Sequence, residues 1–169
     1  MDFNKLIPDF SAIGTTQWNK PYFNTKDLLW LVGAICAVLM VLFAFVPAWF
    51  SMTQEAGPIS VTASRMGIGL WYGFFAFVGA VIAVYGLLYE RYQFAFWGGV
   101  IALLFAFIGF FMVPSLTIEI AGISKEASSA DVKASMGEAG VSYNRFGTLF
   151  TFIAALGTVI CSFLKIQKQ

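Results

Sequence analysis

Four apolar stretches, each with an interior free of charged residues, constrain this chain more than any other feature of its sequence. They lie at about residues 28–50, 67–89, 94–114 and 146–165. A helix of about 20 apolar residues is long enough to cross a hydrocarbon core about 30 Å thick. The sequence therefore predicts an all-α membrane protein, built as a four-transmembrane-helix bundle.

The composition supports lipid as the solvent of this chain. Apolar residues make up 59% of the sequence and charged residues 11%, whereas a soluble domain averages about 25% charged residues. The net charge of +1 gives no support to nucleic-acid binding. Histidine is absent, which removes the commonest general base and the commonest metal ligand.

The chain divides into an N-terminal segment, residues 1–26, and a transmembrane domain, residues 27–169. Apolar residues recur at helical spacing in the first segment, which predicts a helical turn or two lying along the membrane surface. A polar tail with accidental spacing is the alternative. These residues are Phe3, Leu6, Ile7 and Phe10, and Trp18, Tyr22 and Phe23 follow them. Asn24 or Thr25 is expected to cap the first long helix, with Asp27 at the positive end of its dipole.

The two outer loops, residues 51–66 and 115–145, carry strand signals. Apolar and polar residues alternate over 59–64 and again over 116–120, which is the period of a strand. Ser128 and Asp131 resemble a capping box that opens a short helix ending near Gly137. The loops therefore predict a small strand-containing outer cap, in which strands of the two loops pair.

The distribution of basic residues sets the expected orientation. Four spans place both termini on one side of the membrane. That side carries six Lys or Arg residues and the other side four, so the positive-inside rule predicts an integral membrane protein with both termini cytoplasmic. The six are Lys5, Lys20, Lys26, Arg91, Lys165 and Lys168, and the four are Arg65, Lys125, Lys133 and Arg145.

Aromatic residues at the span ends predict two belts at the headgroup level. Trp30, Tyr89, Tyr92 and Trp97 mark the inner boundary, and Trp49, Trp71, Tyr72 and Tyr143 mark the outer one.

Short matches between the two halves of the chain indicate an internal repeat. Val46-Pro47 ends the first span and Val113-Pro114 the third. Arg65-Met66-Gly67 precedes the second span and Arg145-Phe146-Gly147 the fourth. These matches predict two similar helix–strand–helix hairpins related by an approximate two-fold axis along the membrane normal. Chance similarity in a biased sequence is the alternative.

Small residues at helical spacing predict close helix contacts. Such faces let helix backbones approach each other in lipid. They serve either packing within the bundle or contact with a partner or a second copy of the chain. The selected residues are Gly69, Gly73, Ala76, Ala80, Ala102 and Ala106.

A few polar residues suggest chemistry outside the spans. Arg65 and Arg145 are expected to contact lipid phosphates or to form outer salt bridges.

Cys36 and Cys161 lie in apolar stretches and are interpreted as two small buried side chains, with a disulfide as the alternative. Ser124-Lys125 as a nucleophile pair and the loop acids as a cation site are both less favoured than ordinary solvated surface. The acids are Glu119, Glu126, Asp131 and Glu138.

Trp49 and Gly69-Leu70-Trp71 resemble the tryptophan and GLW motif of the claudin and peripheral-myelin tetraspan family. The resemblance covers about 25 residues, and it implies four spans, inner termini and strands in the outer loops. The outer-loop cysteine pair that follows GLW in that family is missing here, and no function is carried over from it.

The sequence predicts no catalytic, cofactor-binding or metal-binding residue. No ionisable residue lies at mid-membrane depth, where proton- and ion-coupled transporters usually need one. We therefore expect a non-enzymatic structural or accessory subunit of a larger membrane complex or homo-oligomer, whose partners are the bilayer and other membrane subunits or itself. The alternatives are a small transporter or channel component with a path between subunits, and an enzyme acting on lipid through Arg65, Arg145, Glu119 and Ser124.

Overall fold

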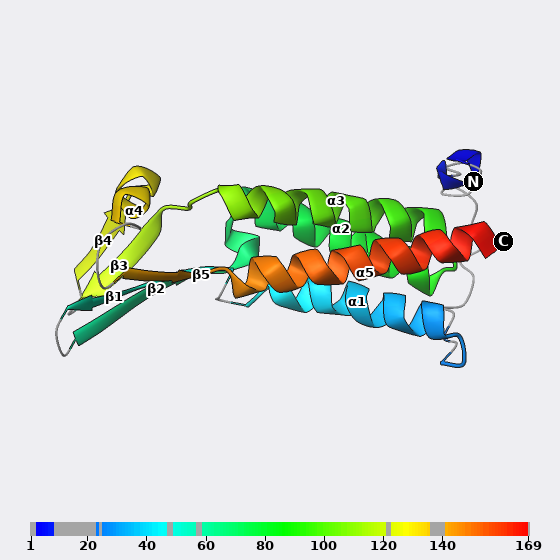
Figure 1. Ribbon diagram of the computed structural model, residues 1–169, viewed down its shortest axis with the longest axis horizontal. Helices are drawn as coiled ribbons and strands as arrows, with labels where there is room; N and C mark the ends of the chain where they lie inside the picture. The colour runs from blue at the N-terminus through cyan, green and yellow to red at the C-terminus, as the bar shows by residue number, and fades with distance from the viewer. Residues whose placement is uncertain are drawn as a thin grey trace.

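A computed structural model describes residues 3–8, 23, 25–46, 49–56, 59–120, 123–135 and 141–168. It is a bundle of long helices with a β-containing cap at one end and both chain termini at the other (Figure 1). The expectations for Phe10, Trp18, Tyr22, Asn24, Pro47 and Gly137 lie outside the described residues.

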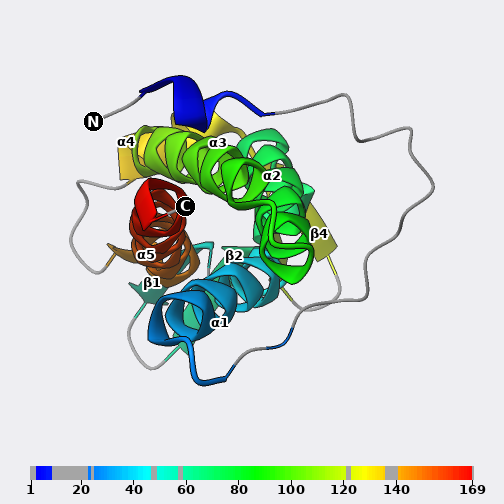
Figure 2. The same ribbon diagram turned by 90° about the vertical axis from the view of Figure 1, so that its right-hand side faces the viewer.

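Four apolar helices run side by side in the bundle (Figures 1 and 2). They are α1 (Leu28–Ala44), α2 (Trp71–Leu88), α3 (Tyr92–Phe111) and α5 (Phe146–Lys168). Three of them, α2, α3 and α5, are long and apolar enough to cross a membrane, while α1 has 17 residues. The expected mostly helical, membrane-like bundle is thus confirmed in this coarse form, with three candidate spans.

The helix boundaries differ from the expected spans at the outer end. Helix α1 stops at Ala44 rather than near Phe50, because Phe50 already starts strand β1 and pairs with Arg65. At the start of the second span, a 3₁₀ turn, η3 (Gly67–Gly69), precedes α2, so the α-helix begins at Trp71. Strand pairing in the cap therefore takes residues that hydropathy alone assigns to helices.

Helices α2 and α3 meet through glycine and alanine at backbone distance. A Cβ atom added at Gly79 would lie 2.7 Å from the backbone oxygen of Gly98. One added at Gly98 would lie 2.5 Å from the backbone nitrogen of Ala83, and one at Gly86 would lie 2.3 Å from that of Ala95. These distances leave no room for a side chain, so the small residues set the approach of the two helices.

Helices α1 and α5 interlock through the two cysteines. A Cβ atom added at Gly33 would lie 3.2 Å from Cβ of Cys161, and one added at Gly157 would lie 2.8 Å from Sγ of Cys36. Each thiol-bearing residue thus packs over a glycine of the other helix. Both cysteines are free, and Cys161 is buried as expected, whereas Cys36 is only partly buried.

The cap contains two sheets and one short helix. Strand β1 (Phe50–Ala56) lies between β2 (Ile59–Arg65) and β5 (Val141–Asn144), and both pairings are antiparallel. Strands β3 (Leu116–Ile120) and β4 (Ile123–Ala127) form a separate hairpin. Strands from the two outer loops therefore pair, as expected, although the pairing joins β1 to β5 rather than β2 to β3.

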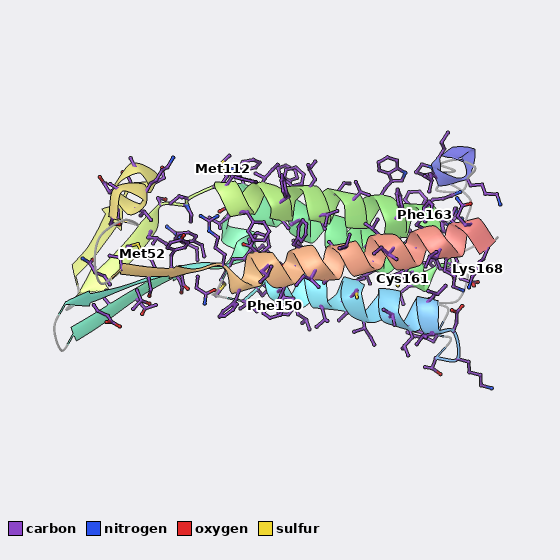
Figure 3. The ribbon with its side chains drawn as sticks, viewed as in Figure 1. Met52, Met112, Phe150, Cys161, Phe163 and Lys168 are labelled. Carbon is purple, nitrogen blue, oxygen red and sulfur yellow. The ribbon has the colours of Figure 1, made fainter. Side chains whose placement is uncertain are left out.

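The cap has its own small hydrophobic core. Side chains from the first sheet pack against the hairpin and against α4 (Ser129–Ser135). The expected capping box is present, because the backbone nitrogen of Asp131 donates to Oγ of Ser128, and Ser128 donates to the Asp131 carboxylate. The core residues are Phe50, Met52, Ala63, Leu116 and Val132, and Figure 3 labels Met52 within the cap.

The aromatic-belt prediction is wrong for half of its residues. Trp71, Trp97 and Tyr143 are exposed as expected, but four of the eight aromatic residues are at most 4% exposed. Indole Nε1 of Trp30, for example, donates to the carbonyl oxygen of Leu87 inside the bundle. The four buried residues, Trp30, Trp49, Tyr72 and Tyr92, join helices instead of facing headgroups.

At the end that holds the termini, Asp27 connects α1 to α5. Its carboxylate accepts from the backbone nitrogen of Trp30, so Asp27 itself is the N-cap of α1. The same carboxylate forms an ion pair with Lys165, whose ammonium also lies 5.3 Å from the ring centre of Tyr92 on α3. One ionic contact thereby holds three helices together at this end.

The short 3₁₀ helix η1 (Phe3–Leu6) packs on the start of α3. Its carbonyl oxygens accept from Nε2 of Gln93 and Nε1 of Trp97, at Lys5 and Leu6 respectively. Residues 3–6 therefore contact the start of α3, and a place of this segment along the membrane surface stays a prediction.

We predict that Asp27→Asn lowers stability in detergent by about 0.5–1 kcal/mol, because it removes the ion pair but keeps the cap. Thermal unfolding of Asp27→Asn, Lys165→Met and the double variant measures the coupling. The bond from Lys165 holds the pKa of Asp27 below its usual 3.8. The stabilisation by the Asp27–Lys165 ion pair is therefore present above pH 3.8 and is lost as the pH falls through the lowered pKa of Asp27. Additive effects in the double variant would refute the coupling.

Candidate functional site

The residues with the most unusual environment gather at the cap end of the bundle, around Trp49. Trp49 follows α1 and is 1% exposed. A Cβ atom added at Gly67 would lie 2.5 Å from Cε2 of its indole, and one added at Gly147 would lie 2.4 Å from Cδ1 of the same five-membered ring. The indole is therefore held between the first turns of the second and fourth apolar segments.

The two glycines that contact Trp49 belong to the two matching motifs of the sequence. We call the Trp49 ring between Gly67 and Gly147 the wedge. Gly67 follows Arg65-Met66 and Gly147 follows Arg145-Phe146, and both glycines contact the same tryptophan. These glycines were expected to let two helices come close to each other. Instead, each makes room for the Trp49 ring, which lies between the two segments. An approximate two-fold relation of the two hairpins is consistent with this arrangement and stays a prediction.

Neighbouring groups from the other helices also contact Trp49 or each other. We call this meeting point around Trp49 the outer junction. The hydroxyl of Thr148 donates to the carbonyl oxygen of Trp49 over 3.0 Å. The ring centre of Tyr72 lies 6.2 Å from that of Trp49, and Gly109 of α3 faces both Tyr72 and Thr148. Four apolar segments of the chain therefore meet at this one level.

Arg145 places a positive charge beside the wedge. Its Nη1 donates to the carbonyl oxygen of Gly109 over 3.4 Å, and its guanidinium lies 5.4 Å from the ring centre of Phe50 and 5.9 Å from that of Tyr143. Its Nε and the Trp49 indole nitrogen are buried without a hydrogen-bond partner. The guanidinium of Arg145 therefore brings a positive charge to the junction, and two N–H donors there, one of them its own Nε, are covered by protein without an acceptor.

Arg65 lies on the neighbouring strand, paired with Phe50 across β1 and β2. Its Nε donates to the carbonyl oxygen of Ser115 over 3.2 Å. Arg65 therefore donates to a carbonyl oxygen just before β3 and Arg145 to one in the last turn of α3, and contact of either with lipid phosphate stays a prediction. For the lipid-enzyme alternative, the structure describes only that Glu119 and Ser124 are opposite each other in the β3–β4 hairpin.

The structure places the small residues selected from the sequence in two kinds of position. Gly69 is exposed, and a Cβ atom added there would have no neighbour within 4 Å. The other five are buried between helices of the same chain, so their surfaces are covered within one molecule. They are Gly73, Ala76, Ala80, Ala102 and Ala106. Sequence reasoning missed most of the residues at the closest α2–α3 contacts, although small residues at positions 79, 83 and 86 and at 95 and 98 carry the same spacing signal.

Sequence reasoning also missed a stripe of hydroxyl groups along the inner face of α5. Its four Thr and Ser residues are at most 1% exposed. Thr158 donates back to the carbonyl oxygen of Ala154, while the hydroxyls of Thr151 and Ser162 are buried without a partner. The signal was their spacing, because residues 148, 151, 158 and 162 share one helical face. We call this set, Thr148, Thr151, Thr158 and Ser162, the hydroxyl stripe.

Among the described residues, no three Cys, Asp or Glu side chains gather to hold a metal ion. No family model, curated protein or solved structure matches this chain. The outer junction and the hydroxyl stripe are therefore interpreted from their own chemistry.

We predict that Gly67→Ala destabilises the protein by about 1–3 kcal/mol, because its Cβ would overlap the Trp49 ring. Gly69→Ala in the same 3₁₀ turn is the matched control and is expected to be neutral, since that position has open space. Thermal unfolding in detergent measures both. Combining Gly67→Ala with Trp49→Leu should recover part of the loss, and equal effects of the two glycine variants would contradict the wedge.

Proposed function

We propose that this chain is a non-enzymatic multi-pass membrane protein that acts as a structural or accessory subunit of a larger membrane assembly or homo-oligomer. The observation that carries the proposal is the outer cap, which is folded around its own core and fixed to the bundle. Strand β1 pairs with β5 from the other loop, and Arg145 stacks on Phe50 of β1. A rigid module outside the membrane is suited to contact with another protein.

The proposed membrane arrangement has four spans. Helix α1 is about 25 Å long by its 17 residues, and it lies alongside the three longer helices over most of their length (Figure 1). Its position in the same layer supports α1 as the fourth span. Both termini lie at the end opposite the cap (Figure 1), and the excess of basic residues supports a cytoplasmic place for them.

The proposed partner surface is the face of the first sheet that points away from the cap core. Met52 and Ala63 oppose each other on the core side of this sheet. The alternate residues of the same strands form rows of small polar groups, in which Thr53 and Thr62 share a hydrogen bond of 3.0 Å. We call this surface, made by Ser51, Thr53, Thr62, Ser64, Ser142 and Asn144, the hydroxyl face. Glu55 continues the β1 row of this face, so a partner would exchange hydrogen bonds with hydroxyl groups beside one exposed carboxylate.

The test is to solubilise the protein mildly from its own membrane and to measure the mass of the complex and its companions. We predict a stable assembly that Thr62→Arg with Ser64→Arg disrupts. Ala134→Arg, an exposed position on α4, adds charge on the other side of the cap and should leave the assembly intact. A lone monomer without a companion chain would refute the subunit proposal, and equal effects of the cap variants would refute the surface.

The second candidate is a small transport or channel component. The hydroxyl stripe favours it, because two buried hydroxyls without partners are costly in a membrane interior. It supports a path along α5 within one subunit rather than between subunits. Purified protein in liposomes should then pass water or small solutes, with loss of flux in Thr151→Val and Ser162→Ala. Absence of flux above empty liposomes would remove this candidate.

A further inference from the structure

The hydroxyl stripe of α5 ends at Ser162, close to the end of the bundle that holds the chain termini. The side chain of Ser162 is 0% exposed, and its Oγ has no hydrogen-bond partner among the described residues. A buried hydroxyl without a partner loses the hydrogen bonds that it makes in water. A bound water molecule restores them, because water both donates and accepts. Ser162 is therefore the first residue of the stripe that water from this end can bind.

Lys165 lies between Ser162 and the surface. The two residues are three positions apart on α5, so they are neighbours on one side of the helix, and Ser162 lies about 4.5 Å deeper. The side chain of Lys165 is 17% exposed. Less than one turn of helix therefore separates the buried hydroxyl from a residue that solvent already reaches.

The Lys165 side chain contacts both helices that flank α5. Helix α5 lies between α1 and α3 (Figure 2). The ammonium group of Lys165 forms an ion pair with Asp27 at the start of α1 and lies 5.3 Å from the ring centre of Tyr92 at the start of α3. Tyr92 is 3% exposed, so its ring belongs to the packed interior. The ion pair therefore holds Lys165 across the approach to Ser162.

This ion pair can open without moving a helix. Lys165 and Asp27 are both partly exposed, so water can hydrate each charge when the two separate. Ion pairs near water are weak, because hydration replaces most of their mutual attraction. The four-carbon stem of lysine is flexible, so the ammonium group can turn toward the surface while α5 keeps its place. Opening the pair therefore removes a cover from Ser162 and leaves the bundle intact.

We propose that the Asp27–Lys165 ion pair is a gate to a water-binding site at the hydroxyl of Ser162. While the pair is closed, Lys165 and Tyr92 cover Ser162. When the pair opens, water from the end with the termini reaches Oγ of Ser162. A role of this gate in transport rests on the second candidate function proposed above, whereas the water-binding site itself does not.

The test is the reaction of a thiol at position 162 with Ag⁺, a thiol-binding ion close in size to a water molecule. Ser162→Cys is made in the full chain together with Cys36→Ala and Cys161→Ala, and the protein is reconstituted in liposomes with Ag⁺ on both sides. Alkylation after denaturation, read by mass spectrometry, counts the thiols that have not reacted. We expect the reaction to become about fivefold faster when Asp27→Asn is added, since asparagine keeps the N-cap and removes the charge.

Three further variants separate the gate from other effects. Lys165→Met removes the other partner of the ion pair and should accelerate the reaction at position 162 to a similar extent. Lys168→Gln removes an exposed cation of the same helix and should leave the rate unchanged. Ala76→Cys reports on unfolding, because Ala76 is 1% exposed at the cap end, and this thiol should stay unreactive with or without Asp27→Asn.

Equal rates at position 162 with and without Asp27→Asn would overturn the gate. Acceleration at position 76 as well as at position 162 would also overturn it, because the bundle would then have loosened as a whole. Solute flux in the same liposomes tests the transport role separately. If no solute passes but Asp27→Asn still accelerates the reaction at position 162 alone, the transport candidate is refuted and the gate stands.

Discussion

Close backbone contact between helices is the interaction on which the rest of this structure depends. Lipid tails are as apolar as the side chains that they surround, so helices in a membrane gain little from burying apolar surface against each other. Association then comes from dispersion contacts at short range. Gly79 and Gly98 bring α2 and α3 together at distances that exclude any side chain, whereas between α1 and α5 the glycines Gly33 and Gly157 make room for the side chains of Cys161 and Cys36.

The two ends of the bundle are closed by different chemistry. At the end with the termini, Asp27 and Lys165 form an ion pair near water, where each charge keeps part of its hydration. At the cap end, a neutral ring fills the space between Gly67 and Gly147. The charged contact lies where solvent can reach it, and the apolar wedge lies inside. The ion pair thereby avoids the cost of burying charge without solvent, whereas at the cap end Nε of Arg145 is buried without a partner.

Much of the helical framework could be predicted, because apolar length and the absence of interior charge are local properties of sequence. Alternation also predicted β2 and β3, and the spacing of Ser128 and Asp131 predicted α4. The extent of α1 could not be predicted in this way, since its last expected residue, Phe50, is equally apolar in a strand or a helix. Only its pairing with Arg65 decides between them.

The candidate site was harder to predict than the fold. Trp49 was assigned to an aromatic belt because a tryptophan near a span end usually faces headgroups. Its burial depends on two glycines distant in sequence, and no local pattern connects them to it. The hydroxyl stripe was overlooked because four Thr and Ser residues are few in number, although their common face carried the signal.

The pairing of β1 with β5 has a consequence for the order in which the chain is assembled. Residues 50–56 leave the ribosome early, and their second neighbour, residues 141–144, comes only just before the last helix. The edge of β1 must therefore remain without this neighbour while two further helices are synthesised and inserted. Closure of the sheet is thus a late event in biogenesis, and a chain that stops before β5 would display an open strand edge, which is a template for pairing with another chain.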